Sequence, residues 1–170
     1  VSRGLGDVYK RQQARLLSRR LYGMYARELF LAGEARDFLE AENYFRAEVS
    51  SPDRSADEIT EGCCVAARAA RLRGAAVTFF KYTSKVIAGD GCSEICCELG
   101  YFYEETGDFE EAAVWYYNAA YETQPVLALR SSEEEPLQGL IRCYEHLGLP
   151  AQARSYAEEL KHRQNEQTDN

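Results

Sequence analysis

The sequence predicts an all-α protein made of four helical hairpins. Apolar residues recur at spacings of three and four over most of the 170 residues, as on one face of an α-helix. The chain has four prolines and no alternating run of β-branched residues, which argues against strands. Four glycines separate such stretches at intervals of 41, 33 and 41 residues, namely Gly33, Gly74, Gly107 and Gly148. Each of these glycines predicts the turn of one hairpin.

The first two hairpins are expected at about 13–49 and 56–88. The apolar period of the opening helix runs through Leu17, Leu21, Met24, Tyr25, Leu29 and Phe30. The composition of residues 50–55 predicts a loop after the first hairpin. Ser55 followed three residues later by Glu58 has the pattern of a capping box, so the next helix should begin near residue 56.

The other two hairpins are expected at about 92–123 and 134–163. Gly100 and Ala112 lack bulk, which should let the two helices of the third hairpin approach closely. Asp108 should cap the second of these helices with its carboxylate. The tail at 164–170 is polar and is expected to fray.

Residues 92–125 resemble a tetratricopeptide (TPR) repeat. The matching positions are Leu99, Gly100, Tyr103, Gly107, Ala112, Tyr116 and Ala119. Cys96 stands where the repeat has its first aromatic residue, and Pro125 arrives one residue late. The spacing of 33 residues between Gly74 and Gly107 fits a TPR period of about 34. The resemblance implies that residues 13–163 form a right-handed α-α superhelix, a TPR-like solenoid that binds a protein or peptide as a scaffold without chemistry of its own.

A second resemblance covers about residues 15–160. It is to the helical repeat region that follows the catalytic domain in many bacterial family 2 glycosyltransferases, and residues 25–29, 94–100 and 115–117 carry it. It implies an alternative function as an accessory C-terminal region, whose partner would be a covalently linked N-terminal catalytic domain. The metal-binding Asp-x-Asp motif of that family has no counterpart here, so no catalytic residue is carried over.

The start of the chain has an unusual sequence. The chain begins with Val, and residues 1–12, VSRGLGDVYKRQ, resemble a translated sequencing-library adapter. We therefore expect this segment to be non-native or disordered.

Composition and motifs exclude several classes of function. The net charge of −8 argues against general nucleic-acid binding. No apolar run approaches the 20 or so residues of a membrane span, and no signal peptide is visible. Glycine-rich phosphate loops and paired nucleophile–histidine motifs are absent, so neither an enzyme nor a cofactor is expected. His146 and His162 lie near helix ends, where a cation complements the helix dipole.

Six cysteines occur without a CxxC motif. We expect reduced thiols acting as small buried residues in a cytoplasmic protein, with no metal. The alternative is a metal site built from Cys92, Cys96 and a third ligand.

In TPR arrays the first helix of each repeat lines the concave face. By that resemblance the candidate binding face comprises Arg27, Arg68, Arg71, Tyr101, Glu104, Glu105 and Arg142. A groove of this composition would be basic toward its start and acidic toward its end. The alternative interpretation is that these are ordinary exposed helix residues.

Overall fold

The structure, a computed structural model, is helical and has no strand in the residues that it describes, which are 2–31, 35–127 and 129–168. Side chains are described in the same ranges except at 2–7, 25, 27–29, 31, 35–41, 130–132 and 167. The helices are α1 (Ser2–Leu31), α2 (Ala35–Glu48), α3 (Ala56–Leu72), α4 (Ala76–Ile87), α5 (Ser93–Glu105), α6 (Phe109–Tyr117), α7 (Arg130–His146) and α8 (Pro150–Thr168). A π-helical turn, η1 (Asn118–Glu122), continues α6. The all-α prediction is confirmed.

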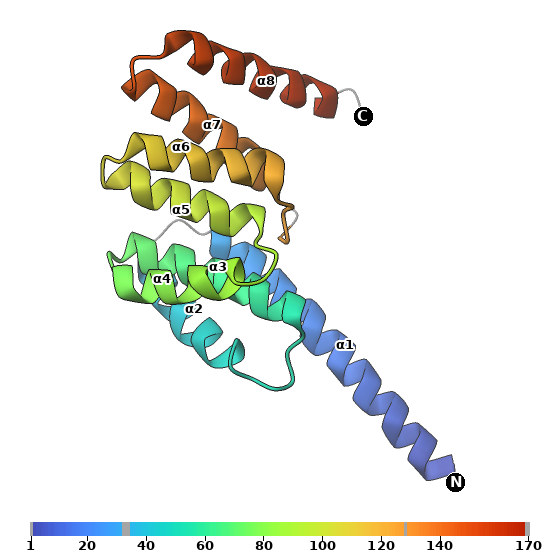
Figure 1. Cartoon of the computed structure of the whole chain (residues 1–170). Coiled ribbons are helices and arrows are strands. Elements are labelled where there is room, and N and C mark those ends of the chain that lie inside the picture. Colours follow the sequence, from blue (N-terminus) through green and yellow to red (C-terminus); the bar gives the residue numbers. More distant parts are fainter. Residues whose placement is uncertain (1, 32–34, 128, 169–170) are drawn as a thin grey trace.

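Successive helical pairs are stacked on one another along the molecule (Figure 1). Helices α1, α3, α5 and α7 form one row, because each contacts the next: α1 with α3, α3 with α5, and α5 with α7. Helices α2, α4 and α6 each also pack against the helix that follows, and α8 packs against α7. The N-terminal part of α1 projects beyond this stack as a rod (Figure 1).

Local signals in the sequence explain where several helices begin and end. The Ser55 hydroxyl accepts a hydrogen bond from the Glu58 amide, and Asp108 accepts one from the Glu111 amide, so both predicted N-caps are confirmed. After α3, α5 and α7, a glycine takes a φ of +75°, +83° and +71° respectively, which L side chains adopt only under strain. These are the predicted turn glycines Gly74, Gly107 and Gly148. Gly33 lies outside the described residues.

The core has two parts that share α5. The first part lies among α1 to α5 and includes Phe45, Phe79 and Ile95; the second lies among α5 to α8 and includes Tyr116 and Leu140. Because opposite faces of α5 serve the two parts, this helix connects the two halves of the stack.

The ring of Tyr116 explains why two helical positions are glycine. A Cβ at Gly100 or at Gly139 would meet the Tyr116 ring at 2.5 Å, which is too close for real atoms. Gly100 is therefore needed to admit this ring, and not only to bring α5 close to α6. The sequence alone did not single out Gly139, whose contact comes from a helix far along the chain.

Three helix ends differ from the expected ranges. α1 extends back to Ser2 through the segment expected to be non-native or disordered, and α7 begins at Arg130 instead of near residue 134. α8 continues to Thr168, past the expected end of the domain at 163. In the added part of α8, Glu and Gln are good helix formers, and the i,i+4 pair His162–Glu166 spans the expected end at residue 163.

None of the helices in the described part of the chain combines the length and apolarity that crossing a bilayer requires.

Candidate functional site

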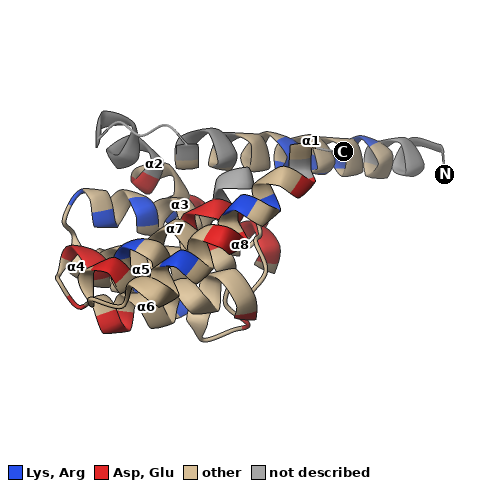
Figure 2. Cartoon of the chain, turned by 90° about the horizontal axis from the view of Figure 1, so that it is seen from above, with Lys and Arg blue, Asp and Glu red and all other residues tan. Residues whose placement is uncertain are grey.

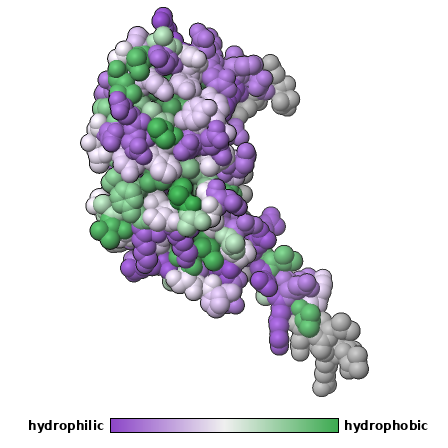
Figure 3. Space-filling view, in the orientation of Figure 1, coloured by the Kyte–Doolittle hydropathy of each residue, from purple (hydrophilic) through white to green (hydrophobic). Residues whose placement is uncertain are grey.

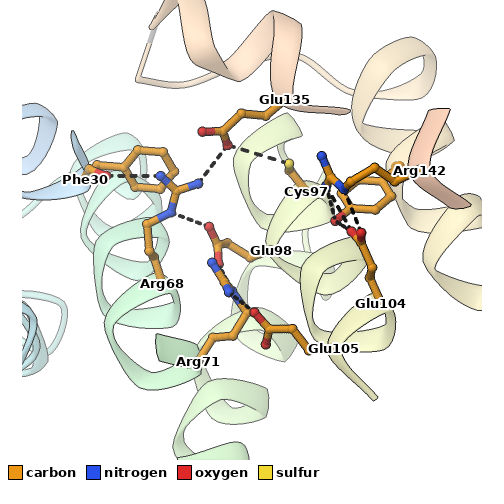
Figure 4. A network of polar contacts seen from close by, with 10 residues as sticks. Phe30, Arg68, Arg71, Cys97, Glu98, Glu104, Glu105, Glu135 and Arg142 are labelled. Atoms are coloured by element: carbon orange, nitrogen blue, oxygen red, sulfur yellow. Dashed lines mark hydrogen bonds and ion pairs between the residues drawn. The ribbon is translucent and has the colours of Figure 1, made fainter. Parts of the chain in front are cut away.

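The row of helices α3, α5 and α7 carries a network of charged side chains (Figure 4). We call it the α3–α5–α7 face and define it by Arg68, Arg71, Glu98, Tyr101, Glu104, Glu105, Glu135 and Arg142. Most of the residues predicted to bind a partner belong to this face. Its charges are paired with one another across the hairpins.

Arg68 of α3 is almost completely buried and uses all three of its guanidinium nitrogens. Nε donates to Glu98 Oε1 at 2.5 Å, Nη2 to Glu135 Oε2 at 2.8 Å, and Nη1 to the carbonyl oxygen of Phe30 at 3.1 Å. The guanidinium also lies 3.6 Å from the centroid of the Phe30 ring, as a cation–π contact. Arg68 thus joins α1, α3, α5 and α7, and its burial between these helices withdraws it from a ligand.

Arg71 of α3 continues the network along the same helix. Its Nε donates to Glu98 Oε2 at 2.6 Å and its Nη1 to Glu105 Oε1 at 2.5 Å. The guanidinium lies 4.7 Å from the centroid of the Tyr101 ring. Glu98, with a side chain that is 0% exposed, therefore accepts one arginine on each carboxylate oxygen.

Arg142 of α7 forms a second cluster with Glu104 of α5. Its Nε and Nη2 donate to the two oxygens of Glu104 at 2.7 and 3.0 Å, which is the bidentate geometry favoured by arginine and carboxylate. The Tyr116 hydroxyl also donates to Glu104, at 2.5 Å. The Arg142 side chain is 39% exposed, and its Nη1 makes no hydrogen bond with the described residues. This edge of Arg142 is open to a partner.

The arginines of this face favour the ionised form of the buried carboxylates beside them. Burial raises the pKa of Glu98, but the positive charges of Arg68 and Arg71 outweigh it and lower the pKa below its usual value. Burial likewise opposes ionisation of Glu104, and hydrogen bonds from Arg142 and Tyr116 bring its pKa below the ordinary range. For Tyr116, burial and the hydrogen bond to Glu104 both raise the pKa of the hydroxyl.

A pocket of about 430 Å³ opens beside Arg142, between α5 and α7. Its lining comprises Tyr101, Glu104, Glu105, Phe109, Arg142 and His146. The imidazole of His146 stacks on the Phe109 ring, with centroids 4.2 Å apart and planes inclined by 6°. The α5–α7 pocket thus places a stacked pair of aromatic rings next to an arginine whose Nη1 makes no hydrogen bond with the described residues.

The structure places the predicted binding residues in different surroundings. Tyr101, Glu104, Glu105 and Arg142 line the α5–α7 pocket together. Arg68 and Arg71 lie in the interior between hairpins, and the Arg27 side chain lies outside the described residues. The expected basic start and acidic end of the face are paired with each other, since arginines of α3 meet glutamates of α5 and α7.

Two glutamates have structural positions that the sequence did not reveal. Glu98 was missed because its arginines come from another hairpin, although its spacing of four residues from Glu94 places both on one side of α5. Glu94 is also buried, and its two oxygens accept hydrogen bonds from the amides of Val126 and Leu127 at 3.0 Å each. It holds the connection before α7 instead of facing a ligand.

One group among the described residues has the spacing of metal ligands: Cys64, Cys92 and Glu94, whose ligand atoms lie within 4.8 Å of one another. Its members differ from the alternative set predicted from sequence, because Cys64 stands beside Cys92 in place of Cys96. Burial, followed by the contact with Cys92, raises the pKa of the Cys64 thiol well above its usual value. Both oxygens of Glu94 already accept backbone amides, so the fit to a metal ion is poor.

Comparison with protein-family models, curated proteins and solved structures finds no match for this chain. The resemblances to TPR repeats and to the glycosyltransferase repeat region therefore stay predictions.

Proposed function

We propose that this chain is a protein- or peptide-binding scaffold module without catalytic activity, and that the α5–α7 pocket receives the bound segment. The observation that supports this most directly is the hydrogen bonding of the Arg142 side chain. Glu104 holds its guanidinium in place through two hydrogen bonds, and Nη1 makes no hydrogen bond with the described residues and could donate to a partner. A pre-positioned arginine loses little conformational entropy on binding, which favours its use as an interface anchor.

The pocket suggests the chemistry of the segment. A carboxylate or carbonyl oxygen would accept from Arg142 Nη1, and a flat apolar side chain would lie against Phe109 and His146. Acidic residues close to the pocket are neutralised in part by Arg142 and Arg71. The wider stack would be a right-handed TPR-like superhelix, in which the row of α1, α3, α5 and α7 forms the inner wall. The six free, buried cysteines fit a reducing, cytoplasmic location.

The test is a selection of displayed random peptides on the full chain, followed by affinity measurements with a synthetic copy of an enriched peptide. Arg142→Ala should weaken binding tenfold or more, equivalent to about 1.4 kcal/mol. Arg154→Ala is the matched control, because Arg154 is an exposed arginine on α8 outside the pocket, and it should bind like the unchanged protein. Failure to enrich any peptide, or equal affinity of Arg142→Ala, would contradict the proposal.

A second candidate function is the accessory region of a family 2 glycosyltransferase. The observation that favours it is an apolar stripe on α1 comprising Leu17, Leu21 and Met24, all of which are exposed. The stripe lies on the side of α1 opposite to the buried Tyr22 and Ala26, and apolar atoms are visible on the projecting rod (Figure 3). A covalently linked catalytic domain would cover such a surface.

The charge of α1 also differs from that of the other helices. Residues 13–24, which follow the segment expected to be non-native, contain three basic residues and no acidic one, whereas acidic and basic residues are intermixed over the stack (Figure 2). The natural gene upstream of codon 13 decides this candidate: an α/β domain with an Asp-x-Asp motif there would support it, and an unrelated coding sequence would contradict it.

A further inference from the structure

Two thiols from different hairpins touch inside the first part of the core. Cys64 lies in the middle of α3, Cys92 is the N-cap residue of α5, and their sulfur atoms are 3.5 Å apart. Both side chains are completely buried, and all six cysteines are free. We propose that Cys64 and Cys92 form an oxidation-sensitive pair, in which a peroxide joins the two sulfurs and thereby cross-links α3 to the start of α5. This inference does not depend on the proposed function.

The positions of the cysteines favour a disulfide between Cys64 and Cys92 over the other pairings. Cys63–Cys64 and Cys96–Cys97 are neighbours in sequence on helices, which is poor geometry for a disulfide. Cys64 and Cys92 are 28 residues apart in sequence and are the sulfur pair in contact among the described residues. Because neither sulfur needs a large movement to reach its partner, we expect one disulfide and not a mixture.

The chemistry is a two-electron oxidation with hydrogen peroxide as the oxidant. One thiolate attacks a peroxide oxygen to give a sulfenic acid, and hydroxide leaves and takes up a proton to become water. The second sulfur then attacks the sulfenic sulfur, the S–S bond forms, and a second water leaves. In total, two thiols and one peroxide give one disulfide and two waters.

The surroundings set the rate of this reaction. Burial raises the pKa of the Cys64 thiol, and its contact with Cys92 and the charge of Glu94 act in the same direction. Little thiolate is therefore present at neutral pH, and the reaction should be slow there and faster as the pH rises. Peroxide is small enough to reach a buried thiol during local opening, whereas glutathione disulfide is much larger.

The cross-link would fix the interface that carries the charged network. Cys64 lies one helical turn before Arg68 on α3, and Cys92 precedes Glu98 on α5. A disulfide at one end of the α3–α5 contact would restrict the relative motion of the second and third hairpins. The protein should then resist unfolding better when it is oxidised.

The experiment treats the folded, reduced full chain with hydrogen peroxide at mildly alkaline pH and then blocks the remaining thiols under denaturing conditions. Digestion with trypsin and a glutamate-specific protease separates residues 62–68, which contain Cys63 and Cys64, from 86–94, which contain only Cys92. The expected product is a linked pair of these two peptides, lighter than their sum by two hydrogen atoms. The midpoint of thermal unfolding should rise by about 5 °C or more and return after reduction.

Two variants test whether Cys64 and Cys92, and not the adjacent cysteines, form the disulfide. Cys92→Ser should fold normally, because serine is a favoured N-cap residue, and it should give no linked peptide. Cys63→Ser is the matched control, since it removes an adjacent buried thiol, and it should still give the link. Absence of the link from the oxidised natural chain would overturn the proposal. So would stoichiometric zinc in the purified protein that Cys92→Ser fails to retain, because the pair would then be a metal site.

Discussion

Arg68 of α3 and Glu98 of α5 belong to different hairpins, and they meet at 2.5 Å where neither side chain has much contact with water. A second arginine, Arg71, binds the other oxygen of the same carboxylate at 2.6 Å. Burying a charge is costly unless it is paired, and Glu98 is the fully buried carboxylate that both guanidinium groups share, beside their more exposed partners Glu135 and Glu105. Glu98 is therefore the residue on which the junction between the second and third hairpins depends most.

Glu98→Gln should destabilise the protein by about 3 kcal/mol, because it leaves two buried arginines without their shared counter-charge. The measurement is the free energy of unfolding in urea at neutral pH. Glu105→Gln is the control: Glu105 also pairs with Arg71 but its side chain is 53% exposed, so the loss should stay below about 1 kcal/mol. Equal losses in the two variants would contradict the central place of Glu98.

Stability should fall in acid because of Glu98 and Glu104. Both have a pKa below the ordinary value of 4.5 in the folded state. The unfolded chain therefore takes up protons first as the pH falls, and the stability that these groups contribute above about pH 4.5 is lost progressively below it. Unfolding free energies measured between about pH 6 and pH 3 should show this slope. The double variant Glu98→Gln, Glu104→Gln should show a shallower slope, and an unchanged slope would be evidence against these two groups as its source.

Alanine at Gly100 or Gly139 should each cost about 1–3 kcal/mol, because the new methyl group would collide with the Tyr116 ring. Urea unfolding measures the change. Gly23→Ala is the matched control in a helix: its Cβ would lie 3.6 Å from the Glu61 carboxylate, an ordinary contact, so the variant should be neutral or up to about 1 kcal/mol more stable. Equal changes in the unfolding free energy of all three variants would contradict the proposed collision with the Tyr116 ring.

Asp108→Ala should cost about 1 kcal/mol, since the Glu111 amide at the start of α6 would lose its acceptor. Thermal unfolding of Asp108→Asn provides the comparison, because asparagine caps helices equally well and should retain most of the stability. A loss of the same size in Asp108→Asn would point to the charge of Asp108 and not to its hydrogen bond.

The sequence predicted most of the fold because its signals are local. Helical periodicity, the caps at Ser55 and Asp108, and the glycines at 74, 107 and 148 depend on residues within a few positions of one another. The candidate binding face was predicted less well. Its residues were identified as a set, but the periodicity of single helices does not reveal which charges are paired across hairpins.

The sequence by itself therefore determined where this protein is helical, where it turns, and which residues share a helix face. Only the tertiary structure decided which of those residues are available to a partner. Arg68 binds glutamates that are 30 and 67 positions away in sequence, and it is enclosed by them, whereas Arg142 keeps a free edge because Glu104 meets it from one side only. Such pairings depend on how the hairpins stack, and that arrangement results from contacts spread over the entire chain.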